Sequence, residues 1–267
     1  MSGVLGLEPS AVEAAARAVR PAGGDLEEVF ARGAWTGIAE PGDGVAGALL
    51  QAYGPVDALA ALATGTRPFE DPALSAAFDR WRPRLDAATL LRAFHNAAQL
   101  GIRLLVPSDP DWPGGFDDLG AHAPLALWAL GSADVLAALA RSIALVGARA
   151  ATGYGEQVAA EAAAGLVDRG FAIVSGAAYG IDGTAHRAAL ASGGATVAVL
   201  AGGLDRFYPS GHAALLQRIA RDGAVLAELP CGFAPTKWRF LQRKVKSHGS
   251  GGAGRCAPMG ARPTLSP

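Results

Sequence analysis

Four short apolar runs, each separated from the next by a helix-length segment, constrain the fold of this chain more than any other feature. The apolar runs span residues 142–146, 172–174, 196–200 and 225–227, and the segments between them span 154–169, 181–191 and 213–221. Near-continuous apolar strands that alternate with helices are typical of a mainly parallel sheet with right-handed crossovers and covered faces. The sequence therefore predicts a doubly wound α/β fold that binds its ligand beyond the carboxyl ends of the strands.

The chain divides into three predicted parts. Residues 1–100 are rich in Ala, Leu and Val at helical spacing, which indicates a small N-terminal helical domain. Residues 101–243 contain the four apolar runs and form the predicted second domain. Residues 244–267 lack apolar periodicity, so we expect a disordered or degenerate tail there.

The composition excludes several classes of protein. A hydrophobic content of 51% with 18% charged residues is typical of a globular protein with a substantial core. No stretch approaches the roughly 18 consecutive apolar residues of a spanning helix, so we expect no membrane association and a cytoplasmic location. Cys231 and Cys256 lack zinc-site spacing, so neither a disulfide nor a metal is expected. A net charge of −1 still allows a local basic strip to bind phosphates.

A turn rich in small residues follows the first apolar run and reads Gly147-Ala-Arg-Ala-Ala-Thr-Gly-Tyr-Gly155. It places Gly147, Arg149 and Thr152 ahead of a helix N-terminus, where main-chain N–H groups and the helix dipole favour a phosphate. Arg149 can add a charged contact, although a tight turn with a surface arginine is the alternative. A dinucleotide site is disfavoured, because GxGxxG is absent and Ser175 stands where a ribose-binding carboxylate is needed.

A second small-residue turn, Ser175-Gly-Ala-Ala-Tyr-Gly-Ile-Asp182, follows the second apolar run. Ser175 and Gly176 are candidates for a second phosphate contact, and a purely structural turn is the alternative. Asp182 and His186 are four residues apart on one helix face, so they form either a catalytic dyad or scaffolding. Scaffolding is favoured because the sequence shows no nucleophile elbow and no carboxylate–histidine cluster, so we expect no enzyme activity.

Two later segments supply further candidates. The loop after the third apolar run contains Asp205 and Tyr208, and Tyr208 can pack rather than bind. From Lys237 to Lys246, five basic residues interleave with Trp238 and Phe240. Aromatic rings stack bases for about 1–3 kcal/mol each while cations contact phosphates, so this pattern indicates single-strand binding. A solvated basic tail with a core aromatic is the alternative.

These blocks, in this order, resemble the DNA-processing protein A (DprA, also called Smf) family. The family pattern runs G-S/A-R-x-x-T-x-Y-G, S-G-x-A-x-G-I-D-x-x-A-H, G-x-D-x-x-Y-P and E-x-P. The chain matches it at Gly147, Arg149, Thr152, Tyr154 and Gly155; Ser175, Gly176, Ala178, Gly180, Ile181, Asp182, Ala185 and His186; Gly203, Asp205, Tyr208 and Pro209; and Glu228 with Pro230. The resemblance implies a Rossmann-like fold and a cofactor-free protein that binds incoming single-stranded DNA and loads a RecA-type recombinase during natural transformation. A homodimer is a further expectation.

The resemblance also assigns roles to residues. It implies DNA phosphate contacts at Arg149, Ser175 and Gly176. Gly147 and Thr152 are further phosphate-binding candidates because of their place ahead of the helix N-terminus, and Asp182, His186, Asp205 and Tyr208 are expected to form the scaffold of the site.

Phe240 and Arg243 match part of a further family block, F-x-x-R-N-R, which implies base stacking for Phe240 and a phosphate contact for Arg243. That block breaks at Lys244-Val245-Lys246, so we expect a truncated or frameshifted C-terminus.

Two other functions share this kind of core. One is a nucleotide-binding or phosphoribohydrolase protein that resembles the lysine-decarboxylase-like group, whose loop is similar to P-G-G-x-G-T-x-x-E. The corresponding loop, Ala201-Gly-Gly-Leu-Asp205, lacks the Gly-Thr pair and the glutamate, which disfavours that activity. The other is a sensor of a small nucleotide, since the same turns can hold one phosphate.

Overall fold

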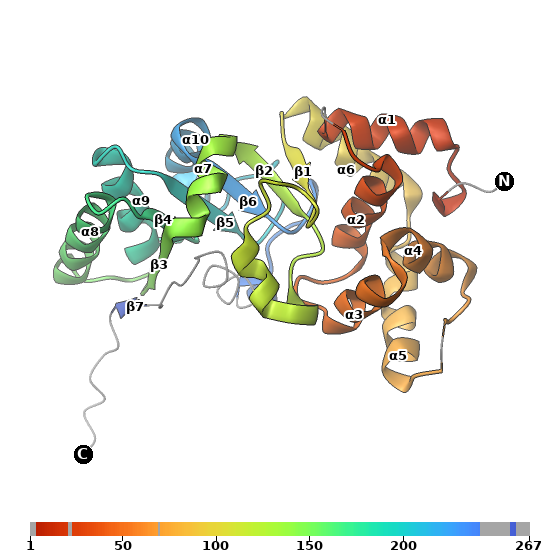
Figure 1. Ribbon diagram of the computed structural model, residues 1–267. Coiled ribbons are helices and arrows are strands. Elements are labelled where there is room, and N and C mark those ends of the chain that lie inside the picture. Colours follow the sequence, from red (N-terminus) through yellow and green to blue (C-terminus); the bar gives the residue numbers. More distant parts are fainter. Residues whose placement is uncertain (1–3, 21–22, 69, 241–256, 260–267) are drawn as a thin grey trace, which may run out of the picture.

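The structure, a computed structural model, describes residues 4–20, 23–68, 70–240 and 257–259 of the 267-residue chain. Figure 1 shows a helical region at one end of the molecule and an α/β layer with α8 and α9 at the other. Arg243 and most of the predicted tail lie outside the described residues, and the predicted domain boundaries remain predictions.

The helical region precedes the sheet. Its elements are η1 (Val4–Gly6), α1 (Pro9–Val19), α2 (Leu26–Ile38), α3 (Gly44–Tyr53), α4 (Pro55–Thr64), α5 (Pro72–Trp81), η2 (Arg82–Arg84) and α6 (Ala87–Gln99). Aspartates cap several of these helices: the carboxylates of Asp25, Asp43, Asp71 and Asp86 each accept hydrogen bonds from two main-chain N–H groups of the first turn. Such caps satisfy N–H groups that have no partner within the helix.

The remaining elements form the α/β layer. They are β1 (Arg103–Leu105), η3 (Gly114–His122), β2 (Leu127–Gly131), α7 (Ala133–Ala137), η4 (Ala138–Arg141), β3 (Ser142–Gly147), α8 (Gly153–Val167), β4 (Ala172–Ser175), α9 (Ile181–Ala191), β5 (Thr196–Leu200), η5 (Ser210–His212), α10 (Ala213–Asp222), β6 (Ala224–Ala227) and β7 (Ala257–Met259). In the described part of the chain the strand order is β1-β2-β6-β5-β4-β3-β7.

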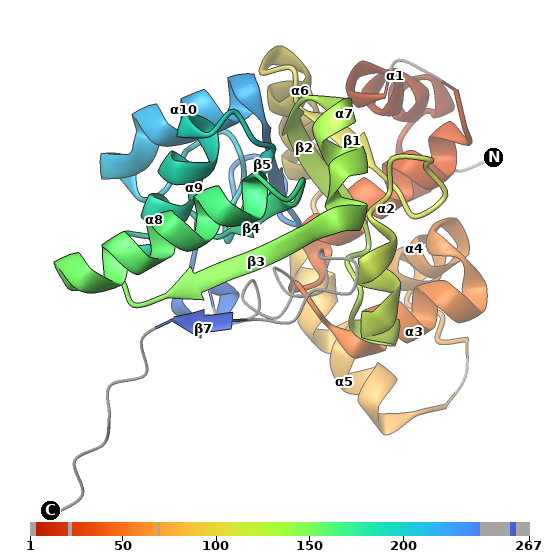
Figure 2. The same ribbon diagram turned by 60° about the vertical axis from the view of Figure 1, so that its left-hand side comes forward.

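Strands β3, β4, β5 and β6 are adjacent and parallel, whereas β1 and β2 join the sheet in antiparallel fashion. The predicted α/β class with a mainly parallel, Rossmann-like sheet is therefore confirmed. From β3 to β6 the chain advances one strand at a time in one direction, so right-handed crossovers place α8, α9 and α10 on the same face. Figure 2 shows these three helices grouped together, apart from the helices α1 to α5.

Both faces of the sheet are covered by apolar packing. On one face, Leu145 and Ile173 pack against Ala163 of α8 and Ala185 of α9. On the other face, alternate strand residues pack with side chains of η3, α7 and η4. The strands are thus buried on both faces, which explains their near-continuous apolar sequences.

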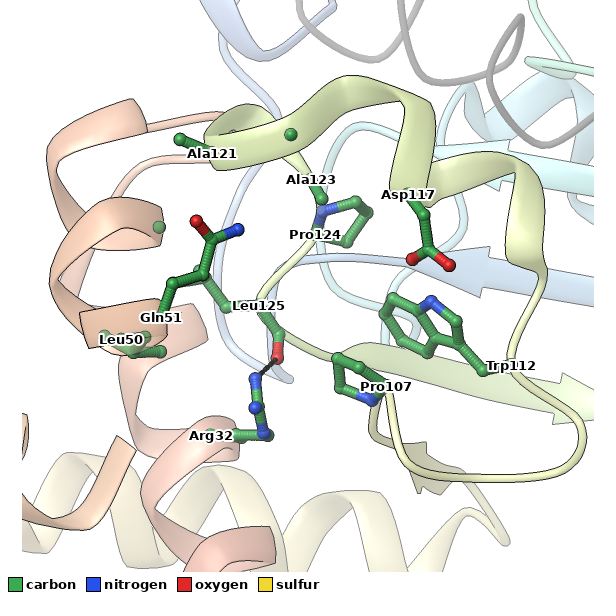
Figure 3. A pocket seen from close by; sticks show the side chains of 12 residues that line it. Arg32, Leu50, Gln51, Pro107, Trp112, Asp117, Ala121, Ala123, Pro124 and Leu125 are labelled. Atoms are coloured by element: carbon green, nitrogen blue, oxygen red, sulfur yellow. Dashed lines mark hydrogen bonds between the residues drawn. The ribbon is translucent and has the colours of Figure 1, made fainter. Parts of the chain in front are cut away.

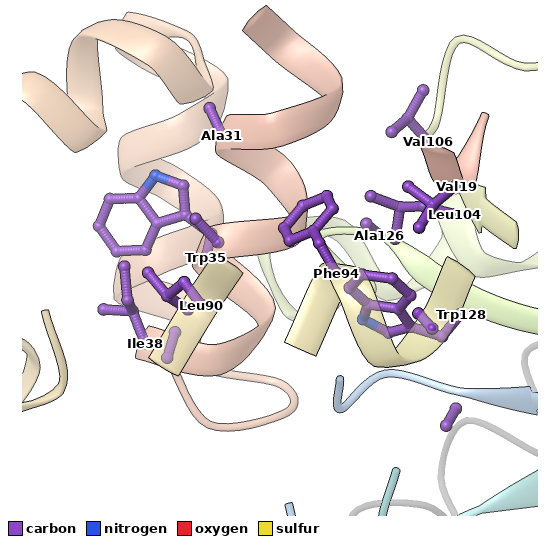
Figure 4. Close-up of a cluster of buried hydrophobic side chains, with 14 of the residues drawn as sticks. Val19, Ala31, Trp35, Ile38, Leu90, Phe94, Leu104, Val106, Ala126 and Trp128 are labelled. Atoms are coloured by element: carbon purple, nitrogen blue, oxygen red, sulfur yellow. The ribbon is translucent and has the colours of Figure 1, made fainter. Parts of the chain in front are cut away.

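The core of the helical region continues into the sheet without a break. Trp128 of β2 packs edge-on against Phe94 of α6, with ring centroids 5.3 Å apart, and its indole N–H donates to Thr36 Oγ1 at 3.0 Å. Figure 4 shows Phe94 and Trp128 beside Leu104 and Val106 in this buried cluster. Helices α2 and α6 therefore extend the helical layer over the β1–β2 end of the sheet.

Among the described residues, no single helix combines the length and apolar character that a membrane crossing needs. The consecutive helices α3 and α4 pass that test as a pair, by length and composition alone, with a bend of 110° between them.

Candidate functional site

The loops that follow β3, β4, β5 and β6 meet at one edge of the sheet, because these strands are adjacent and parallel. The loops span residues 148–152, 176–180, 201–209 and 228–236. Ligands of open α/β sheets bind at this carboxyl edge. It also contains the motifs that the sequence singled out.

Arg149 lies in the first loop with an exposed side chain. The loop ends at Thr152, which caps α8 by accepting a hydrogen bond from the Gly155 N–H at 3.2 Å. The Thr152 hydroxyl keeps its own proton as a donor. Arg149 and the start of α8 thus present positive charge and hydrogen-bond donors to solvent, which suits a phosphate.

The first two loops pack tightly against each other at Gly180. Gly180 has a φ of +72°, and a Cβ there would lie 2.3 Å from the carbonyl oxygen of Ala148 and 2.6 Å from that of Arg149. The N–H of Ile181 also donates to the Ala148 carbonyl at 3.2 Å. A residue without a side chain is therefore required here, and its close approach sets the position of the Arg149 loop.

Asp182 ties the same two loops together. Its carboxylate is 4% exposed and accepts hydrogen bonds from the Gly147 N–H and the Ala178 N–H, each at 3.4 Å. This arrangement agrees with a scaffold role for Asp182. The Gly147 N–H thus has a partner within the protein, and the phosphate contact expected at Gly147 stays a prediction.

Ser175 also has a partner within the protein. Its side chain is fully buried, and its hydroxyl donates to the Leu145 carbonyl on β3 at 2.6 Å. In this structure the hydroxyl is thus directed at the sheet rather than at solvent, and the phosphate contact expected of Ser175 stays a prediction. A DNA phosphate would have to contact the main chain of this turn instead of the Ser175 hydroxyl. Gly176, the next residue, is also buried.

His186 is buried in the sheet–helix interface. Its Nδ1 lies 2.8 Å from Thr196 Oγ1, whose hydroxyl donates to the Ile173 carbonyl at 2.9 Å. Because that hydroxyl proton is already used, the imidazole donates from Nδ1 to Thr196. His186 thus links α9 to β5 and β4, which fits scaffolding better than a dyad open to substrate.

The third loop packs against the segment that follows β6. The N–H of Gly203 donates to the Phe233 carbonyl at 2.9 Å, and a Cβ on Gly203 would lie 2.3 Å from the Pro230 carbonyl oxygen. Asp205 Oδ1 accepts a hydrogen bond from the Gly232 N–H at 2.9 Å. Asp205 therefore holds two loops together.

Burial, and then the nearby Asp205 charge, raises the pKa of Cys231 to about 12.

Three residues from distant parts of the sequence meet at this edge. The Cζ atom of Arg149 lies 4.9 Å from the ring centroid of Phe240, which is a cation–π arrangement. The ring of Tyr208 lies 5.6 Å from that of Phe240. Phe240 thereby joins the loops after β3, β5 and β6 into one surface of cationic and aromatic side chains.

The segment that contains Phe240 is attached to the helical region by ion pairs. Arg239 contacts both carboxylate oxygens of Glu40, at 2.9 and 3.0 Å, and Arg84 contacts Oε1 at 2.9 Å. Burial alone would raise the pKa of Glu40, but the hydrogen bonds and charges of Arg239 and Arg84 outweigh it and lower that pKa. Trp238 and Phe240 flank this anchored arginine.

Two residues of the edge escaped the sequence interpretation. His212 of η5 is buried and its Nδ1 lies 3.0 Å from the Ala177 carbonyl oxygen. The ring of Tyr179 packs edge-on against it, with centroids 4.8 Å apart. Tyr179 stands inside the second turn, so its place was visible in the sequence, whereas nothing in the sequence marks His212.

The more spacious of two cavities does not coincide with the cationic edge of the sheet. A cavity of about 340 Å³ lies between α2, α3 and the segment 107–125 (Figure 3). Its Arg32 is already occupied, since the guanidinium bonds Glu28 and the Leu125 carbonyl, and Asp117 adds negative charge. The hollow beside Tyr208 and Phe240 measures only about 10 Å³. The cationic edge is thus an open surface, and the larger cavity is poorly suited to a phosphate.

Within the described residues, no group of three or more His, Cys, Asp or Glu side chains is placed to hold a metal ion.

The fold and this edge define a class: a Rossmann-like α/β protein whose strand ends present a cationic and aromatic surface. The sequence model of the DNA recombination-mediator protein A family matches residues 103–247, more than half of the chain. The chain therefore belongs to that family, and the resemblance noted from its motifs is confirmed.

Relatives with known names support this assignment. The chain is 55% identical over 153 residues to the putative DNA processing protein DprA of Mycobacterium tuberculosis, which covers 54% of this chain and 39% of that protein. It is 40% identical over 160 residues to the DNA processing protein DprA of Streptococcus pneumoniae, which covers 60% of this chain and 54% of that protein. The chain thus matches about two fifths to one half of the length of these relatives.

Solved structures show the same fold. The X-ray structure of DprA from Streptococcus pneumoniae matches with a TM-score of 0.65 and 27% identity, over 84% of this chain and 75% of that one. A structure that describes the single-stranded DNA binding mode of DprA from Helicobacter pylori matches with a TM-score of 0.50 and 29% identity, over 57% of this chain and 67% of that one.

Proposed function

We propose that this chain binds single-stranded DNA at the carboxyl edge of its sheet, without turnover and without a cofactor. The observation that carries the proposal is the exposed Arg149, whose guanidinium lies over the ring of Phe240, while Phe240 also packs against Tyr208. Cations that contact phosphates next to rings that can contact bases are the two components of single-strand binding. The Helicobacter pylori relative, whose structure describes such binding, supports the same ligand class.

The shape of the edge favours a polymer over a small nucleotide. Small-molecule sites are concave and enclose most of the ligand surface. Here the hollow beside Tyr208 and Phe240 is about 10 Å³, too small for a nucleotide, while the loops around it are exposed. A flexible single strand can lie across such a surface and contact several loops at once.

The phosphoribohydrolase alternative is weaker on two grounds. Its characteristic Gly-Thr pair and glutamate are absent from the loop after β5. In addition, Gly203 of that loop packs directly on the Pro230 carbonyl, so the loop is covered by protein where a nucleotide phosphate would have to approach.

The proposed biological role follows from the family. We infer that the chain protects single strands and passes them to a RecA-type recombinase, with DNA uptake during natural transformation as the setting. A homodimer and an intracellular location belong to the same proposal. The family's description as a recombination mediator supports this role.

A competition titration tests the ligand class. Fluorescence anisotropy of a labelled oligo-dT would be followed as unlabelled oligo-dT, duplex DNA of equal length or thymidine monophosphate is added to the purified, folded chain. We expect oligo-dT to displace the label far better than the duplex, and the mononucleotide to compete poorly. Efficient displacement by the mononucleotide would instead support a small-nucleotide sensor.

A further inference from the structure

Among the exposed tyrosines of the carboxyl edge, two lie in the loops that follow neighbouring strands. Tyr179, in the loop after β4, is 47% exposed, and Tyr208, in the loop after β5, is 50% exposed. Strands β4 and β5 are neighbours, about 4.8 Å apart in a sheet, so these loops are adjacent. Exposed tyrosine rings are typical of binding surfaces, because the ring is apolar and its hydroxyl stays wet.

Each ring is supported by packing within the protein. Tyr179 packs edge-on against His212, at an interplanar angle of 66°, and the Nδ1 of His212 lies 3.0 Å from the Ala177 carbonyl oxygen. Tyr208 packs against Phe240 at an interplanar angle of 52°. Both rings are therefore held in place before any ligand arrives, which lowers the entropy lost on binding.

Phe240, in contrast, already has a partner over its ring. The guanidinium of Arg149 lies 4.9 Å from the ring centroid, where a stacked base would otherwise lie. Planar guanidinium groups stack on aromatic faces in this way. Phe240 is therefore well placed to orient Arg149 toward a phosphate and poorly placed to stack a base itself.

We propose that Tyr179 and Tyr208 stack the bases of the strand whose phosphates contact Arg149, and that Phe240 positions Arg149. This inference rests on the proposed function. It places the path of the strand across the loops after β3, β4 and β5. It also divides the affinity into a salt-dependent part from Arg149 and a base-dependent part from the two tyrosines.

The test compares a normal oligo-dT with an abasic oligomer of the same length, which keeps the phosphates and lacks the bases. We expect Tyr179→Ala and Tyr208→Ala each to weaken oligo-dT binding by about 5- to 150-fold, with an unchanged salt slope. Their affinity for the abasic oligomer should equal that of the unmodified chain. The Tyr→Phe variants should keep most of the affinity, because the ring remains.

The matched control is Tyr53→Ala, since Tyr53 is 39% exposed but lies at the end of α3 in the helical region. It should leave binding of both oligomers unchanged. Full affinity of folded Tyr179→Ala and Tyr208→Ala for oligo-dT would overturn the inference. If the unmodified chain bound both oligomers with equal affinity, base stacking would be overturned, whereas phosphate binding would still be supported. If the folded, unmodified chain bound neither oligomer, the proposed function itself would be overturned.

A photocrosslink gives a second readout that needs no variant. An oligomer that contains 5-iododeoxyuridine forms adducts with aromatic side chains in contact with the base. We expect adducts on the peptides that contain Tyr179 and Tyr208. Adducts confined to Phe240 would overturn the assignment.

Discussion

At the scale of single residues, the position of Arg149 depends on the close approach at Gly180. Gly180→Ala would strain a backbone at φ +72° and place a Cβ 2.3 Å from the Ala148 carbonyl oxygen. Strain and overpacking together should lower the free energy of unfolding by about 2–4 kcal/mol. Urea unfolding of the variant measures this loss, and the displaced Arg149 loop should also weaken binding of oligo-dT.

The matched control for this prediction is Gly193→Ala. Gly193 has a φ of +69°, but nothing lies within 4 Å of the position of its Cβ. It should cost only the backbone strain, about 1 kcal/mol, and should leave DNA binding unchanged. Equal losses in the two variants would contradict the steric role assigned to Gly180.

At the scale of elements, the Glu40–Arg239 ion pair attaches the segment after β6 to the end of α2. Because the pKa of Glu40 is lowered in the folded protein, its stabilisation is present above the ordinary value of 4.5 and is lost as pH falls below it. Glu40→Gln should therefore lower stability by about 1 kcal/mol or less at pH 7, since the pair is partly exposed. The difference from the unmodified chain should shrink as the pH is lowered toward about 4.

Urea unfolding of both proteins at several pH values measures this effect. Glu13→Gln is a suitable control, because Glu13 is exposed on α1 and forms no ion pair among the described residues. A Glu40→Gln difference that grows on acidification would contradict the direction of the Glu40 pKa.

The elements themselves were largely predictable from the sequence. Each predicted apolar run became a strand whose ends agree within one residue, because buried parallel strands must be apolar on both faces. The small-residue turns were correctly placed at one edge, since parallel strands end on the same side.

The partners of individual side chains were less predictable. Ser175 was expected to face a phosphate but bonds Leu145, because a residue at the end of a central strand is covered by its neighbours. The hydrogen bond between Arg239 and Glu40 joins residues 199 positions apart, and no local sequence pattern predicts such a pair. The same holds for the contact of Arg149 with Phe240.

At the scale of the whole molecule, one apolar core joins the helical region and the sheet through Trp128. Trp128 contacts Phe94 and donates to Thr36, so Trp128→Ala removes packing between both parts. We expect a loss of about 3–5 kcal/mol in the free energy of unfolding. Native-state hydrogen exchange should show this loss equally for amides of α2 and of β5.

Unchanged protection of the α2 amides in Trp128→Ala would show that the two parts unfold independently. That result would contradict a single cooperative core.

The most direct test of the proposed DNA interface is the salt dependence of oligo-dT binding by Arg149→Ala. Each phosphate contact that is lost should reduce the slope of log affinity against log salt by about 0.7. We predict weaker binding and a slope lower by about this amount. Arg221→Ala, whose side chain is 72% exposed at the opposite end of α10, should leave both unchanged. Equal affinity and slope for Arg149→Ala and the unmodified, folded chain would contradict the assignment of DNA phosphates to this edge.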